Sequence, residues 1–161
     1  MLELIIWSLL ICIGVSDAQR HRISNKLVCA LFLVVGVSLA QQFNLDWLIH
    51  LKGFLITFAI GFGLYITRVM AGGDVKLLTV IGLWLGAKTM WQVTPYIIIA
   101  GGVIGCFYLA LHMASSTIPF TQQFKGYAIQ KVTPGWKSKQ PLVIPFAPAI
   151  VIGLAYYFYL N

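Results

Sequence analysis

The sequence predicts an all-α, polytopic membrane protein with about six transmembrane helices. Of its 161 residues, 60% are hydrophobic and only 9% are charged, and the mean hydropathy is +0.89. Soluble globular domains carry about 25% charged residues, whereas a surface that faces lipid is apolar throughout. This composition excludes a disordered chain, a nucleic-acid-binding protein and an ordinary cytosolic enzyme.

Six apolar runs account for the predicted helices, since each span needs about 20 residues. The runs are Leu2–Ser16, Leu27–Ala40, Trp47–Ile66, Leu77–Ala87, Tyr96–Met113 and Leu142–Leu160. The fifth and sixth approach the length of a span unaided, while the first, second and fourth need polar flanking residues. Because the connections are short, we expect residues 1–161 to form a single integral membrane domain.

The distribution of Lys and Arg predicts the orientation of this bundle. Polar connections at about residues 17–26, 68–76 and 114–141 hold all of the 11 Lys and Arg except Lys52 and Lys88. Basic residues concentrate in cytoplasmic loops, so these three connections are predicted to be cytoplasmic and both termini to lie outside. The stretches 41–46 and 88–95 then become outer connections. Glu3 and a lack of basic residues ahead of Arg20 favour a retained first span over a cleaved signal peptide.

The longest polar segment, Ala114–Gln140, mixes lysines with aromatic residues. Such a segment rests on the anionic inner leaflet or forms a solvated basic loop, and the sequence favours the two equally. Three cysteines fall in apolar runs without a CxxC pair, so we expect free, buried thiols. No His, Cys or carboxylate set has metal-ligand spacing, and no order of Ser, His and Asp suggests a covalent nucleophile, so no metal or cofactor is predicted.

Asp17 and Asp74 are the two acidic residues on the predicted cytoplasmic side. Asp17 closes the first apolar run and Asp74 precedes the fourth, so the carboxylates could meet across a helix contact. Two carboxylates that share a site do not both ionise readily, which provides an acid and a base at neutral pH. Taken singly, each aspartate is also explained as a helix cap or as a counter-ion to a nearby basic residue.

The segments around these aspartates resemble those of type IV prepilin peptidases, membrane aspartyl proteases of the GxGD class. The sequence Ala71-Gly72-Gly73-Asp74-Val75-Lys76-Leu77 is similar to the family's GxGD-Val-Lys-Leu pattern, and the segment from Asp17 to Asn25 is similar to its Asp, basic, Ile-Pro-Asn pattern. A third segment, Ile144–Ile150, resembles the family's Pro-Tyr-Gly-x-Ala-Ile. All three occur in the family's order along the chain.

The resemblance implies that Asp17 and Asp74 are the catalytic pair. It further implies a surrounding site to which six residues contribute: Asn25, Gly72, Gly73, Lys76, Pro145 and Phe146. Four positions depart from the family pattern: Ser24 for Pro, Ala71 for Gly, Phe146 for Tyr and Ala147 for Gly. The chain resembles the short members, as in tight-adherence pilus systems, which lack the cytoplasmic methyltransferase domain with paired CxxC motifs.

The resemblance therefore implies an aspartic endopeptidase of the bacterial inner membrane that acts at its cytoplasmic face. Its substrates would be type IV prepilin-like proteins, cleaved after a Gly between a basic leader and a hydrophobic helix. The implied partners are this leader peptide and the lipid bilayer, with no nucleic acid and no cofactor. The alternatives are an inactive peptidase homologue, a non-enzymatic pilus-assembly protein or a small transporter. A transporter would require an ionisable residue in mid-span, which the apolar centres of these runs lack.

Overall fold

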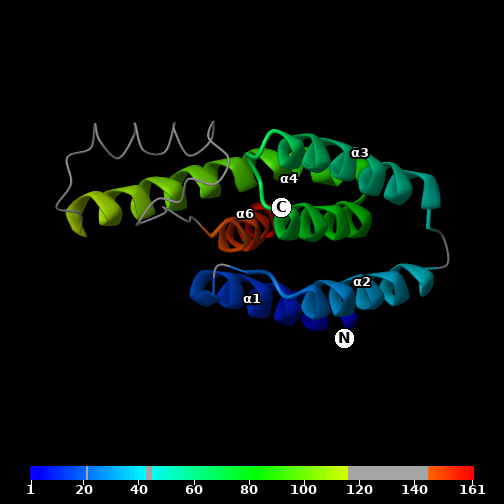
Figure 1. The fold of residues 1–161 in the computed structure, drawn as a ribbon. Helices are drawn as coiled ribbons and strands as arrows, with labels where there is room; N and C mark the ends of the chain where they lie inside the picture. The colour runs from blue at the N-terminus through cyan, green and yellow to red at the C-terminus, as the bar shows by residue number, and fades with distance from the viewer. Residues whose placement is uncertain (21, 43–44, 116–144) are drawn as a thin grey trace. The chain divides into compact units, whose positions relative to one another are not determined.

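The structure, a computed structural model, describes residues 1–20, 22–42, 45–115 and 145–161, with side chains in the third range as far as Leu111 (Figure 1). The helices are α1 (Leu2–Arg20), α2 (Asn25–Ala40), α3 (Trp47–Ile66), α4 (Gly72–Ser115) and α6 (Ala147–Leu160). Strands are absent from these described residues, which confirms the all-α prediction. The predicted basic loop lies outside the described residues from position 116 onward.

The chain divides into two compact units. The first comprises residues 1–101 and 145–161, and the second comprises residues 102–144, of which the helical residues 102–115 are described. Every contact discussed below lies within the first unit. That unit also contains all eight predicted site residues.

Three helices are long and apolar enough to cross a membrane, namely Leu2–Arg20, Trp47–Ile66 and Gly72–Leu111. The helices α2 and α6 are apolar but shorter. Large apolar side chains such as Leu48, Leu55 and Phe62 are exposed on the outside of α3, as expected of a surface that faces lipid. The chain is thus a polytopic helical membrane protein, although the predicted number of six spans is not confirmed.

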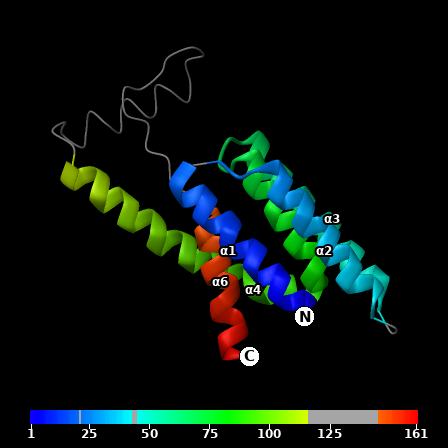
Figure 2. The ribbon, with the colours of Figure 1, turned by 90° about the horizontal axis from the view of Figure 1, so that it is seen from below.

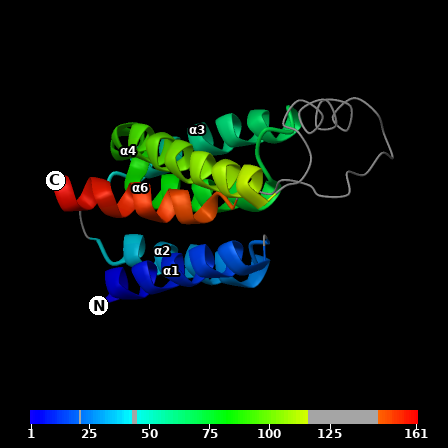
Figure 3. The ribbon, with the colours of Figure 1, turned by 90° about the vertical axis from the view of Figure 1, so that its left-hand side faces the viewer.

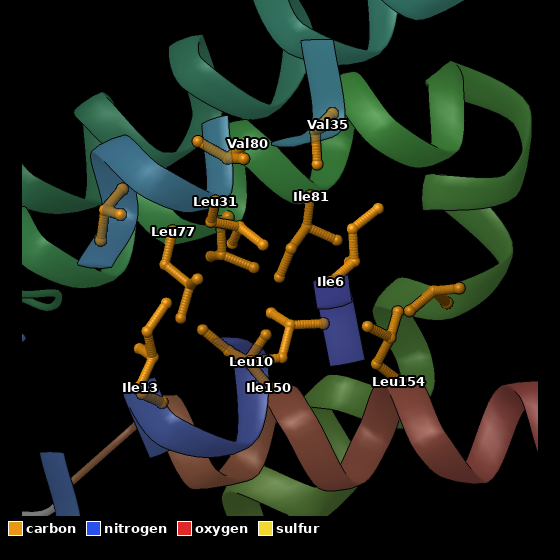
Figure 4. Packing of buried hydrophobic residues seen from close by; sticks show 14 of the residues in the cluster. Ile6, Leu10, Ile13, Leu31, Val35, Leu77, Val80, Ile81, Ile150 and Leu154 are labelled. Carbon is orange, nitrogen blue, oxygen red and sulfur yellow. The ribbon is translucent and has the colours of Figure 1, made fainter. Parts of the chain in front are cut away.

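The core of the first unit forms where apolar faces of α1, α2, α4 and α6 meet (Figure 4). Buried residues of α1 recur at Ile6, Leu10, Ile13 and Asp17, a spacing of three or four that places them on one helix face. The first part of α4 is buried on several sides, with Leu77, Val80 and Ile81 inside. The same stripe that packs α1 into the core therefore carries Asp17 inward.

The helix α6 runs antiparallel to α1 (Figures 2 and 3). Its first residue, Ala147, contacts Asp17 near the end of α1, whereas Phe158 near its own end packs on Trp7 near the start of α1. The two chain termini consequently lie at one end of the first unit. We call that end the pocket end, because Glu3, Trp7 and Phe158 line a pocket there. The opposite end, which holds Asp17 and Asp74, is called the aspartate end.

Glycines permit a very close crossing of α3 and α4. A Cβ atom on Gly53 would meet the carbonyl oxygen of Gly82 and would lie 2.7 Å from the backbone nitrogen of Ala87. Beyond this crossing, Gly86 interrupts α4 with a φ of 75°, a conformation that glycine adopts without steric cost. The break leaves helix-terminal carbonyls in need of partners, and the ring Nδ1 of His50 lies 2.8 Å from the carbonyl oxygen of Leu83.

The chain reverses direction within α4. Asp74 lies at the aspartate end, Trp84 packs on Phe158 at the pocket end, and Gly101 returns to contact Phe146 at the start of α6. The sequence predicted a polar connection between two helices at Lys88–Pro95. That prediction is wrong, because the chain is helical from Ala87 onward. Gly86 alone makes the break, and helix is the conformation that satisfies backbone groups within a bilayer.

The three cysteines do not match the prediction of buried thiols. Cys12, Cys29 and Cys106 are free, as predicted, but all three are exposed on their helices. In a membrane protein an apolar segment packs against lipid as well as against protein, so an apolar neighbourhood in the sequence does not indicate burial. Their exposed positions matter for any labelling experiment on this chain.

Candidate active site

Asp17 reaches the interior because it continues the buried stripe of α1. Only 6% of its surface is exposed, although it lies within one turn of the exposed Arg20. The backbone N–H of Ala147 donates a hydrogen bond to Oδ2 of Asp17 over 3.1 Å, in a buried environment. This bond satisfies one of the unpaired N–H groups that begin α6. A side chain 130 positions away in sequence is thus fixed in orientation by the start of the last helix.

Asp74 occupies the first turn of α4 and is 7% exposed. Ala71 stands where the helix is capped, and Asp74 follows three residues later, where an acidic side chain can reach back to the backbone N–H of the cap residue. The backbone of Ala71 lies within reach of the Asp74 carboxylate. Asp74 therefore has its neighbouring backbone at the start of its own helix, whereas Asp17 is bonded to the start of another.

The connection ahead of Asp74 has a well-defined backbone. At the end of α3, the N–H of Val69 bonds to the carbonyl of Leu64 over 2.9 Å, and the N–H of Arg68 bonds to that of Tyr65 over 3.0 Å. These are the two bonds of a Schellman motif, which requires a left-handed residue, and Arg68 supplies it with a φ of 57°. Because Arg68 is not a glycine, this conformation costs about 1 kcal/mol.

The structure brings the two predicted catalytic aspartates to the same end of the first unit, close enough for a Coulombic interaction between their carboxylates. Among the described residues, neither forms an ion pair with a Lys or Arg. The counter-ion explanation therefore finds no support in this part of the chain. A cap does explain part of each position, yet two mutually interacting buried carboxylates are costly when their sole role is to cap helices.

The glycines before Asp74 differ in what surrounds them. A Cβ on Gly73 would lie 3.1 Å from Cβ of Ile23, in the connection that follows α1, so the backbone of α4 approaches that connection closely. At Gly72 the nearest neighbour would be the ring of Tyr65 at 3.5 Å, an ordinary contact. Gly73 therefore brings the start of α4 next to the end of α1, and Gly72 does not limit that approach.

Lys76 and Asn25 join α4 to α2 at the surface of this region. The ammonium group of Lys76 donates a hydrogen bond to Oδ1 of Asn25 over 3.1 Å, and the contact is exposed. The sequence predicted both residues for the site, and the structure places them in contact with each other. An exposed contact of this kind contributes little to stability, so its importance would lie in where it holds the Lys76 charge.

The segment before α6 carries the remaining predicted residues. Pro145 is buried, and Phe146 caps α6, with its ring close enough to Gly101 that a Cβ there would lie 2.9 Å from Cε2. Pro148 occupies the first turn of α6, where proline loses no helical hydrogen bond. The sequence singles out Ala147 only as a departure from the family pattern. Pro148 predicts that a helix starts here. Because the first N–H groups of a helix have no partner within it, Pro148 also indicates that the Ala147 N–H is free to bond to another group.

Among the described residues there is no group of three or more His, Cys, Asp and Glu side chains that could hold a metal ion. The ionisable side chains that the structure buries together at this end are the two carboxylates. A pair of interacting carboxylates can divide the roles of acid and base between them.

The model of the type IV leader peptidase family matches residues 4–110, well over half of the chain. The chain belongs to the type IV leader peptidase family. The matched range includes both aspartates, the two glycines and the Asn25–Lys76 contact, and it ends before Pro145 and Phe146. Neither the curated proteins nor the solved structures gave a match. Membership in this leader peptidase family identifies the chain as a membrane peptidase relative.

Proposed function

We propose that this chain is an aspartic endopeptidase that removes the basic leader from type IV prepilin-like proteins, with Asp17 and Asp74 as its catalytic pair. One observation carries the proposal. Two carboxylates, from α1 and α4, are buried at one end of the first unit and interact with each other, without an ion pair to Lys or Arg in the described residues. Membership in the leader peptidase family supplies the class of reaction.

The mechanism follows from a pair of carboxylates that share one proton. The ionised carboxylate accepts a proton from a water molecule, whose oxygen attacks the scissile carbonyl carbon. The protonated carboxyl donates a hydrogen bond to the carbonyl oxygen and stabilises the developing charge. Collapse of the tetrahedral intermediate breaks the C–N bond, and a proton passes to the leaving amine. The chain forms no covalent intermediate with its substrate.

The neighbouring residues have positioning roles in this proposal. Gly73 keeps α4 close to the end of α1, whereas Gly72, with only the ring of Tyr65 near it, does not limit that approach. The Ala147 N–H orients Asp17, while Pro145 and Phe146 set where α6 begins. Lys76, held by Asn25, supplies a positive charge at the surface of the site.

We further propose that the site acts at the cytoplasmic face of the bacterial inner membrane. Basic residues of the connections at this end, including Arg20, Arg22 and Arg68, favour that side of the membrane. A leader rich in Lys and Arg is retained on the same side, so substrate and site would meet without transfer of charge across the bilayer. Residues 1–161 would act as one integral membrane peptidase domain, with the prepilin leader and the lipid bilayer as partners and no cofactor.

The test is the processing of a co-expressed prepilin-like substrate, followed by its mobility shift. Asp17→Asn and Asp74→Asn keep the shape of each side chain but cannot share and pass a proton, so each is expected to reduce cleavage at least about 100-fold. Asp46→Asn is the matched control, because Asp46 caps α3 through the N–H of Leu48 and an amide oxygen can replace it.

Asp46→Asn should process substrate at the wild-type rate. The amount of each variant in the membrane is measured alongside, so that loss of protein is not mistaken for loss of activity. Wild-type processing by either aspartate variant, at normal protein levels, would refute the proposal. Failure of the wild-type chain itself to cleave any prepilin-like substrate would indicate an inactive homologue.

A further inference from the structure

A pocket opens at the pocket end of the first unit, away from both aspartates. It has a volume of about 300 Å³ and is lined by residues of α1, α4 and α6. The lining residues are Glu3, Trp7, Trp84, Leu85, Thr89 and Phe158. This volume lies at the lower end of the range for small-molecule sites, about 300–1,000 Å³.

Three aromatic rings gather in the wall of this pocket. The ring centroids of Trp7 and Phe158 are 5.7 Å apart, those of Trp84 and Phe158 are 5.9 Å apart, and those of Trp7 and Trp84 are 6.1 Å apart. Because the three rings contact one another, each holds the others in place, and a ligand would find a wall that is already formed. Tryptophan is the side chain that attracts a cation to its ring face most strongly.

Glu3 adds a full negative charge to the same pocket. Its side chain is exposed, and among the described residues it has no hydrogen-bond or ion-pair partner. At the start of α1 it also complements the helix dipole, but that role leaves its carboxylate free to accept hydrogen bonds. An unpaired carboxylate beside three aromatic rings is the combination that recognises an organic ammonium ion.

The polar atoms favour a primary ammonium over a quaternary one. The Glu3 carboxylate and the Thr89 hydroxyl both accept hydrogen bonds, and a primary ammonium has three N–H groups to donate whereas a trimethylammonium has none. Lys88, exposed and adjacent to Thr89 in the sequence, offers a positive charge at the same end of the unit. A zwitterionic group with an ammonium and a phosphate complements both signs of charge.

We propose that this pocket binds the ethanolammonium headgroup of a zwitterionic phospholipid. Two of the helices around it, α1 and α4, are long and apolar enough to cross a membrane, and the interfacial depth at which tryptophans gather is that of the headgroups. A preference for the interface accounts for Trp7 and Trp84 at this level. It does not account for a cavity between them or for an unpaired carboxylate in it. This proposal is independent of the peptidase activity.

Native mass spectrometry of the full chain in detergent tests it, with phosphatidylethanolamine, phosphatidylcholine and phosphatidylglycerol of identical acyl chains. The wild-type chain should retain phosphatidylethanolamine at least about tenfold more tightly than the other two. Glu3→Gln should abolish this preference, and Trp7→Leu should weaken binding about tenfold, the scale of one cation–π contact together with its packing.

Two matched controls separate the pocket from general effects of charge and aromatic content. Asp46→Asn removes the same charge at a position outside the pocket, and Trp91→Leu removes a tryptophan that is 75% exposed on α4. Both should keep the wild-type preference. A wild-type chain without preference, or with a preference for phosphatidylcholine, would overturn the proposal, as would a preference that survives Glu3→Gln. Free ethanolamine that binds through Glu3 while the lipid does not would show a site for soluble amines instead.

Discussion

The two ends of the first unit place carboxylates in opposite settings. At the aspartate end, Asp17 and Asp74 are 6% and 7% exposed, and the backbone N–H of Ala147 bonds to Asp17. At the pocket end, Glu3 is exposed and has no partner within the described residues. The same functional group is therefore buried at one end and exposed at the other.

This difference indicates two kinds of use. Burial of a carboxylate is costly unless hydrogen bonds or opposite charges offset it. A buried pair without cations therefore retains a proton on one carboxyl group, and the proposed reaction requires such a transferable proton. An exposed carboxylate beside aromatic rings costs little to maintain and can bind a ligand with a positive charge. Three predictions, from the largest expected effect to the smallest, would break or sharpen this contrast.

The first prediction concerns the side of the membrane on which each end lies. In a background without Cys12, Cys29 and Cys106, Arg22→Cys should be inaccessible to an impermeant thiol reagent added outside the cell, whereas Lys88→Cys should be labelled. The contrast should be all or none, because the bilayer excludes a charged reagent. Labelling is measured by the mass added to the purified protein.

Removal of the native cysteines, which are exposed on their helices, leaves the introduced thiol as the single source of signal. Permeabilised cells should label at both positions, which shows that Arg22→Cys is reactive. External labelling of Arg22→Cys in intact cells would place the aspartates on the outer side and would contradict the proposed site of action.

The second prediction compares the two glycines before Asp74. Gly73→Val should force Ile23 away, at a cost of about 1–3 kcal/mol for overpacking, and should slow cleavage at least about fivefold. Gly72→Val meets only the movable ring of Tyr65 and should be much less affected. Rates of leader cleavage by both variants at equal membrane levels measure the difference. Equal losses at the two positions would mean that close approach to Ile23 is not what Gly73 provides.

The third prediction separates the structural role of Asp17 from its chemical role. Asp17→Asn retains an oxygen that can accept the Ala147 N–H, whereas Asp17→Ala leaves this buried donor unpaired, at a cost of about 1–2 kcal/mol. Thermal unfolding in detergent should therefore give a lower Tm for Asp17→Ala than for Asp17→Asn, and both variants are expected to lose cleavage. Identical Tm values would show that the hydrogen bond does not stabilise the start of α6.

Much of the aspartate end was predictable because its signals are local. Three short stretches of sequence each indicate a nearby turn or helix start: the basic connections, the Gly-Gly-Asp segment and Pro148. The spacing from Ile6 to Asp17 carries the aspartate inward by helical periodicity alone. What the sequence could not supply was the Ala147 N–H as the partner of Asp17, because a backbone group has no sequence signature of its own.

Other features were missed because they depend on packing between distant segments. Polar residues at 88–95 predicted a loop, yet Gly86 breaks α4 and the chain resumes helix at once. Apolar neighbours predicted buried cysteines, because composition does not distinguish a lipid-facing side chain from a core one. The pocket at Glu3 was also out of reach of the sequence, since its walls come from three helices.

A double-mutant cycle on the two aspartates tests the central claim most directly. Cleavage rates are measured for purified wild type, Asp17→Asn, Asp74→Asn and the double variant with one prepilin-like substrate. If both carboxylates act on one water molecule, either single change removes the reaction, so the double variant should be as slow as the singles and no slower. Multiplied losses in the double variant, or wild-type rates in either single, would show that Asp17 and Asp74 do not form one catalytic pair.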